Sequence, residues 1–138
     1  MAARRKIGLG IVLGWLVPGL GHLYMKRHVH GALYALCIGG LFAAGLLLAR
    51  GTAVNFEIHP WYFTCQAFAG PVTFMLEFLR GPEAINLGES VGILEHQTGV
   101  VYVATAGVLN LVTLAELYRR HVEPTAPGPA DTMRKGST

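Results

Sequence analysis

The fold is decided by residues 31–49, which read GALYALCIGGLFAAGLLLA and contain no charged side chain. A helix that crosses a bilayer needs about 20 predominantly apolar residues. Three further segments come close to that description: 7–25, 61–79 and 99–118. We therefore predict an all-α fold, an integral membrane bundle of four transmembrane helices.

The composition of the whole chain agrees with this prediction. Of its 138 residues, 52% are hydrophobic and only 14% are charged, against roughly 25% charged in an ordinary soluble domain. A small soluble protein has a large surface for its volume and needs many polar residues to cover it. We expect lipid to cover part of this chain. The sequence has no basic patch with interleaved aromatic residues, so we expect no nucleic-acid partner.

The first segment is interrupted by Pro18, which lacks a backbone N–H and disrupts a helix. Gly19 and Gly21 add flexibility beside it. The stretch from Ile7 to Val17 would rise only about 16 Å as a helix, half of the hydrocarbon core. The segment is therefore either one kinked span or a half-helix that re-enters at Pro18.

The positions of the positive charges discriminate between these alternatives. If all four segments span, eight of the 11 Lys and Arg residues share the side of the N-terminus: Arg4, Arg5, Lys6, Arg50, Arg119, Arg120, Arg134 and Lys135. The opposite side then holds Lys26, Arg27 and Arg80. With a re-entrant first segment the split becomes nearly even. Because positive residues concentrate on the cytoplasmic side, this count favours four spans with both termini in the cytoplasm.

The segments outside the spans have different characters. Residues 1–120 form the predicted helical membrane domain, in which the loop 80–98 could hold an amphipathic helix at the membrane surface. Residues 121–138 are rich in Pro, Gly, Ala, Ser and Thr and show no apolar periodicity. We predict that this stretch is a disordered cytoplasmic tail.

Small residues recur at four-residue spacing in the first two segments, and such stripes let helix backbones approach closely in lipid. The predicted packing residues are Gly10, Gly14, Gly31, Ala35, Gly39 and Ala43. The stripes could pack helices of one chain together or pack the chain against another subunit.

His22 is the most informative polar residue in the predicted membrane segments. One hypothesis is that its imidazole satisfies carbonyl groups freed by Pro18. The other is that it binds a ligand or handles a proton, because ionisable residues at membrane depth are often functional. A haem site would require a second facing histidine, and only His22 is placed for one.

Four other polar residues lie in the predicted spans: Gln66, Glu77, Asn110 and Glu116. An unpaired amide at the depth of Asn110 would be costly, so we expect Gln66 to be its partner, either as structural glue or along a polar path. Glu77 with Arg80, and Glu116 with Arg119 or Arg120, have the three- or four-residue spacing of ion pairs on one helix face.

A motif in the first segment adds a family resemblance. The turn reads Pro18-Gly19-Leu20-Gly21-His22-Leu23-Tyr24. It resembles the first hairpin of small bacterial membrane proteins of unknown function, which reads proline-glycine-leucine-glycine-histidine-x-tyrosine. The similarity continues in Gln66 with Ala69-Gly70-Pro71, in Gly99 with Tyr102, and in Ala106-Gly107-x-Leu109-Asn110-Leu111. Glu116 stands near the place where that family usually has an aspartate. The chain is more distantly similar to a two-pass domain whose loop reads glycine-x-histidine-x-x-tyrosine.

This resemblance implies a compact helical domain in the bacterial cytoplasmic membrane, and it implies no particular activity, cofactor or substrate. The sequence has no nucleophile elbow, zinc-protease or phosphate-loop motif. We therefore expect no catalytic, cofactor or metal site. The leading hypothesis is a non-enzymatic accessory or scaffolding protein, in lipid, that packs as a homo-oligomer or in a larger membrane complex. The alternative is a small channel or transporter subunit with a polar path through His22, Gln66 and Asn110.

Overall fold

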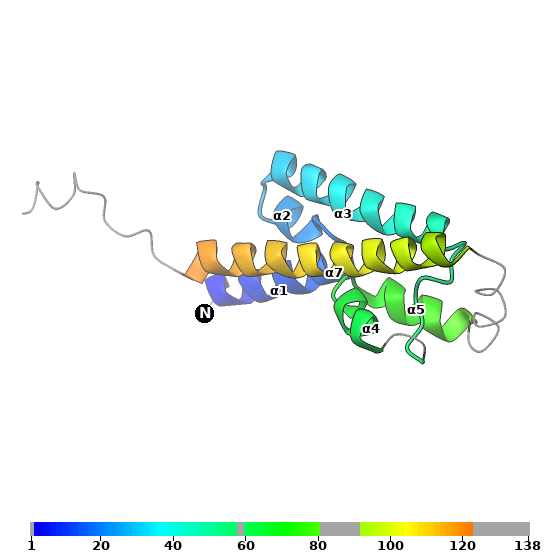
Figure 1. Ribbon diagram of the computed structural model, residues 1–138. Coiled ribbons are helices and arrows are strands. Elements are labelled where there is room, and N and C mark those ends of the chain that lie inside the picture. The colour runs from blue at the N-terminus through cyan, green and yellow to red at the C-terminus, as the bar shows by residue number, and fades with distance from the viewer. Residues whose placement is uncertain (1, 58–59, 81–91, 123–138) are drawn as a thin grey trace, which may run out of the picture.

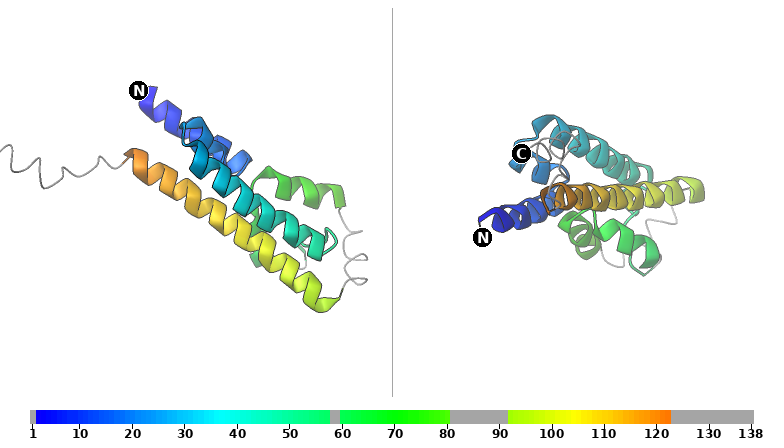
Figure 2. Two further views of the ribbon diagram at one scale, coloured as in Figure 1. Left: turned by 90° about the horizontal axis from the view of Figure 1, so that it is seen from above. Right: turned by 90° about the vertical axis from the view of Figure 1, so that its left-hand side faces the viewer.

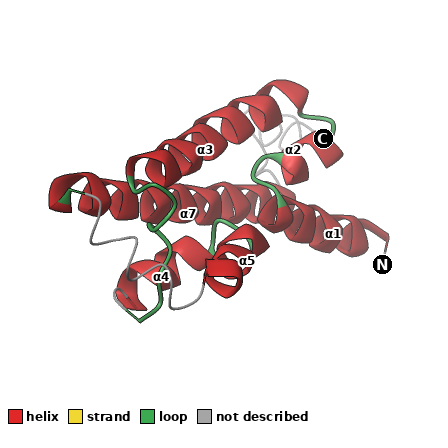
Figure 3. Ribbon diagram, turned by 90° about the vertical axis from the view of Figure 1, so that its right-hand side faces the viewer, coloured by secondary structure: helices red, strands yellow, loops and turns green. Residues whose placement is uncertain are grey.

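The computed structural model describes residues 2–57, 60–80 and 92–122 (Figure 1). Its helices are α1 (Ala2–Leu16), α2 (Leu20–Tyr24), α3 (His28–Leu48), α4 (Pro60–Ala67), α5 (Pro71–Arg80) and α7 (Ile93–Val122). No strand occurs in this part of the chain (Figure 3). The all-α prediction is confirmed. The predicted tail lies almost wholly outside the described residues, since α7 continues to Val122.

Two of the four predicted spans are continuous helices. α3 and the part of α7 up to Arg120 are each long and apolar enough to cross a membrane. They pack closely near Gly45 and Gly99, where a side chain on Gly45 would come within 2.8 Å of the Gly99 carbonyl oxygen. α7 begins at Ile93, so the end of the predicted surface loop is part of a long helix instead. The rest of that loop, 81–91, lies outside the described residues.

The first predicted segment is a hairpin rather than one span. α1 ends at Leu16, just before Pro18, and the chain reverses at Gly19, whose φ of +87° is one that glycine adopts readily. α2 then returns along α1, so closely that a side chain on Gly21 would clash with the Gly10 carbonyl oxygen. The Lys26 turn consequently lies at the same end of the molecule as the start of α1 (Figures 1 and 2). The chain therefore follows the alternative that reverses at Pro18, in place of the single span that the charge count favoured.

The third predicted segment is also broken. α4 ends at Ala67, Gly70 has a φ of +120°, and Pro71 starts α5. α4 lies against α7, where a side chain on Gly107 would clash with the Cys65 carbonyl oxygen. α5 leads back toward the loop after α3, where Glu77 accepts a hydrogen bond of 3.1 Å from the Phe56 N–H. One continuous helix over 61–79 is therefore wrong.

The hydrophobic core lies where α3, α4 and α7 meet the loop after α3. Its buried members are Ala49, Ala53, Val54, Val100 and Val103, with Phe42, Leu46, Phe63 and Leu76 packed against them. These side chains fix the α4–α5 hairpin beside the first half of α7. The α1–α2 hairpin lies beside the second half (Figures 1 and 2). Among the described residues, each half of the chain has a helix, a turn with adjacent proline and glycine, a short helix and a long helix.

Candidate functional site

The two hairpins meet beside Asn110, in the middle of α7. Asn110 is 0% exposed. Its Nδ2 donates hydrogen bonds to the carbonyl oxygens of Gly14, at 3.2 Å, and Phe68, at 2.9 Å. The Thr113 hydroxyl donates to the Asn110 carbonyl oxygen at 2.8 Å. One amide from α7 therefore joins the end of α1 to the turn that follows α4.

The Gly14 carbonyl needs this donor because of Pro18. In a continuous helix the N–H of residue 18 would donate to the carbonyl of residue 14, and proline has no N–H. We expected His22 to satisfy carbonyls freed by Pro18. Among the described hydrogen bonds, Asn110 performs that role for Gly14.

Trp15 plays a similar role at Pro71, where the third predicted segment is broken. Pro71 cannot donate to the carbonyl of Ala67, four residues earlier. The indole Nε1 of Trp15 donates to that oxygen at 3.3 Å, beside the N–H of Gly70 at the same distance. Sequence reasoning missed Trp15. The available signal was the proline at each break, which lacks the N–H that would donate to the carbonyl four residues earlier.

Gln66 does not pair with Asn110 as we expected. It is buried, and its Nε2 donates to the carbonyl oxygens of Ala53, at 3.0 Å, and Val100, at 3.4 Å. Its Oε1 is buried and has no hydrogen-bond partner among the described residues. Gln66 and Asn110 therefore fix α4 to α7 at two separate levels, each through backbone carbonyls.

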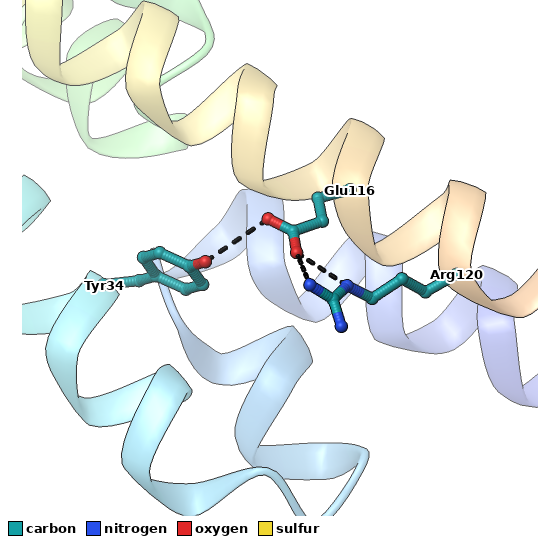
Figure 4. Close-up of polar contacts among 3 residues, drawn as sticks. All are labelled: Tyr34, Glu116 and Arg120. Atoms are coloured by element: carbon teal, nitrogen blue, oxygen red, sulfur yellow. Dashed lines mark hydrogen bonds and ion pairs between the residues drawn. The ribbon is translucent and has the colours of Figure 1, made fainter.

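A second polar cluster lies toward the end of α7. The Tyr34 hydroxyl donates to Glu116 Oε2 at 3.3 Å, and Arg120 Nε donates to Glu116 Oε1 at 2.6 Å (Figure 4). His22 is 3% exposed, and its ring meets the Tyr34 ring edge-on with 4.9 Å between centroids. The predicted pairing of Glu116 with Arg120 is confirmed. The cluster connects α2, α3 and α7.

Glu77 lies apart from both clusters. Its carboxylate accepts from the Phe56 N–H, and the side chain of Arg80, its predicted partner, lies outside the described residues. The described residues contain no group of three or more His, Cys, Asp or Glu side chains that could hold a metal ion.

Only some of the predicted packing residues lie at contacts between helices. Gly10, Gly14 and Gly31 are buried, and the Ala35 methyl lies beside Gly19. Gly39 and Ala43 are exposed, and a side chain on Gly39 would meet nothing within 4 Å. We did not anticipate three glycines at close helix contacts: Gly45, Gly99 and Gly107.

Comparison with known proteins identifies one family. The family model described as a family of unknown function, DUF6677, matches residues 9–126. No curated protein and no solved structure matches the sequence.

Proposed function

The chain belongs to DUF6677, a family of unknown function, and from its structure we propose a non-enzymatic membrane protein with an accessory or scaffolding role. The exposure of α3 carries this proposal. Only 17% of its apolar 18-residue window is buried within the protein, and Leu47 is 79% exposed. The central helix of a soluble domain would be mostly buried. Such a large exposed apolar surface is typical of contact with lipid or a partner protein.

In the proposed orientation α3 and α7 cross the bilayer, and the two hairpins enter it from opposite sides. Broken helices are tolerated at membrane depth only where protein or water satisfies the freed backbone groups. The hydrogen bonds from Asn110 to Gly14 and from Trp15 to Ala67 meet that requirement at the two hairpin turns. They support half-depth hairpins in lipid.

The distribution of charge supports one orientation. Lys6 and Lys26 belong to the end of the molecule where α1 begins, and so does Arg119 near the end of α7 (Figure 1). Arg50 follows α3 at the opposite end. By the positive-inside rule, both termini and the Lys26 turn face the cytoplasm of a bacterial inner membrane. Because both the first and the third segments are hairpins, the charge bias that a re-entrant first segment alone would remove is retained.

The scaffolding role rests on how the polar residues are used. Asn110 and Gln66 donate to backbone carbonyls, and Glu116 is paired with Arg120. This arrangement favours packing over a polar path, with a second copy or a larger membrane complex as the partner. The resemblance of residues 17–24 to the hairpin of small bacterial membrane proteins, and distantly to a two-pass domain, agrees with the turn at Pro18 and Gly19.

Cysteine labelling tests the topology. In a Cys37→Ala, Cys65→Ala background, single cysteines replace Lys26, Arg50 or Arg119 and meet a membrane-impermeant maleimide in spheroplasts and in inverted vesicles. We expect Lys26→Cys and Arg119→Cys to react from one side and Arg50→Cys from the other. Four spans would instead pair Arg50→Cys with Arg119→Cys. Release of the protein by alkaline carbonate would contradict membrane insertion itself.

A further inference from the structure

An apolar cavity of about 130 Å³ lies where the two hairpin turns approach α3. Val17 and Pro18 line it from the first turn, Gly39 and Phe42 from α3, and Ala69 from the second turn. The cavity is partly open to the outside of the protein. Cavities with apolar walls stay dry and accept apolar ligands, so water is a poor occupant.

The depth of this cavity matches the end of a lipid tail. Gly39 follows His28, the first residue of α3, by eleven residues, a rise of about 16 Å along the helix. That is about half of a hydrocarbon core roughly 30 Å thick, the depth at which the tails of one leaflet end. A tail from the leaflet at the Lys26 end would reach Gly39 with its terminal carbons.

Between the cavity and that end, one face of α3 is exposed. His28, Ala32 and Gly39 recur on it at four- and seven-residue intervals, and Leu36, which is 74% exposed, borders it. Arg27, which precedes the first residue of this face, is partly exposed. Positive charge at the helix start complements a phosphate, and the small residues Ala32 and Gly39 leave room for a tail beside Leu36.

We propose that the cavity between Pro18, Gly39 and Ala69 holds the end of one acyl chain of an anionic phospholipid, whose phosphate lies near Arg27. The inference rests on the proposed membrane insertion. It explains why the exposed centre of α3 carries Gly39: a Cβ there would meet no protein atom within 4 Å, so glycine is not needed for helix packing, whereas a larger side chain would fill the entrance. The bound tail would fill the space between the two hairpin turns.

Trp15 is a natural probe for this site. Its indole bonds to Ala67, close to the cavity wall at Ala69, and Leu16 beside it lines the cavity. The chain has two tryptophans, so Trp61→Phe leaves Trp15 alone. The full chain would be reconstituted in vesicles of phosphatidylglycerol brominated either near the tail end or near the headgroup. Trp15 fluorescence would be compared in Gly39→Leu and in Gly40→Leu, a matched control that also meets nothing within 4 Å.

We expect tail-end bromines to quench Trp15 more than headgroup-side bromines, and Gly39→Leu to lose that quenching while Gly40→Leu retains it. In mixed vesicles, brominated phosphatidylglycerol should quench more than brominated phosphatidylcholine, and equal quenching would overturn the anionic headgroup. Melting curves confirm that both leucine variants fold.

Strong quenching that is equal in the two leucine variants would overturn the tail site but leave membrane insertion standing. Absence of quenching at every bromine position, with release by carbonate, would overturn insertion itself. Oxidation that links Cys37 of two copies, lost in Gly39→Leu, would assign the cavity to a second copy and overturn the lipid proposal.

Discussion

Asn110 Nδ2 lies 3.2 Å from the carbonyl oxygen of Gly14 and donates a hydrogen bond to it across 96 residues of chain. The Gly14 carbonyl is the one that Pro18 would have bonded in an unbroken helix, had proline an N–H. The break in the first hairpin and the amide in the last helix are therefore two parts of one structural device. The same amide holds Phe68, at the turn of the second hairpin.

Replacing Asn110 with Leu should destabilise the protein. The side chains are similar in size, but one buried and one partly buried carbonyl lose a donor, at about 1–3 kcal/mol for a fully buried unsatisfied group. Thermal unfolding in one mild detergent measures the loss. Leu109→Ala is the control, because Leu109 is exposed on the same helix. If the two variants melt alike, Asn110 does not hold the hairpins together.

Trp15→Phe should cost about 0.5–1.5 kcal/mol, the net value of one hydrogen bond. The phenyl ring keeps most of the apolar contact but cannot donate to the Ala67 carbonyl, which retains only the Gly70 N–H. Trp61→Phe is the matched control, since Trp61 is 86% exposed. The melting temperatures of the two variants test this prediction. An equal decrease in melting temperature for both would count against the hydrogen bond from the indole.

Gly107→Ala and Gly39→Ala should move stability in opposite directions. A methyl group on Gly107 would clash with the Cys65 carbonyl oxygen and push α4 away from α7, an overpacking that typically costs 1–3 kcal/mol. A methyl group on Gly39 meets nothing within 4 Å, so Gly39→Ala should gain up to about 1 kcal/mol from helix propensity. Chemical or thermal unfolding of both variants tests this. A stable Gly107→Ala protein would show that α4 and α7 are further apart.

Tyr34 and Glu116 should be energetically coupled. Tyr34→Phe removes the hydroxyl that donates to Glu116 Oε2, and Glu116→Gln removes the charge that Arg120 also uses. In a double-mutant cycle we expect a coupling energy of about 0.5–1.5 kcal/mol, since residues in one hydrogen-bonded network are not additive. Purely additive losses would mean that the contact contributes no stability.

Sequence reasoning reached several features of this site and missed others. The burial of Asn110 followed from the cost of an unpaired amide, and its need for a protein partner was correctly inferred. The identity of that partner was not inferred correctly, because Gln66 and Asn110 each donate to backbone carbonyls of segments distant in sequence. Trp15 was missed for the same reason: its acceptor, the Ala67 carbonyl, is distant in sequence and also accepts the Gly70 N–H.

The packing glycines show a related limit. Gly39 and Ala43 continue the spacing of Gly31 and Ala35, yet they are exposed. Spacing fixes which residues share a helix face, but only the neighbouring helix decides where along that face contact occurs. α7 crosses α3 near Gly45 and Gly99, away from the predicted stripe.

The sequence by itself determined the all-α class, the two long apolar helices and the interruption at Pro18, because these depend on local composition, backbone chemistry and helix length. It left open whether the first segment spans or re-enters. Its signal for the break in the third segment, Gly70-Pro71, was outweighed in our prediction by the mostly apolar composition and spanning length of residues 61–79. Only the tertiary structure decided these points. A half-depth hairpin is possible where another helix supplies donors for its freed carbonyls, and those donors, Asn110 and Trp15, are brought to the hairpin turns by contacts between segments far apart in the chain.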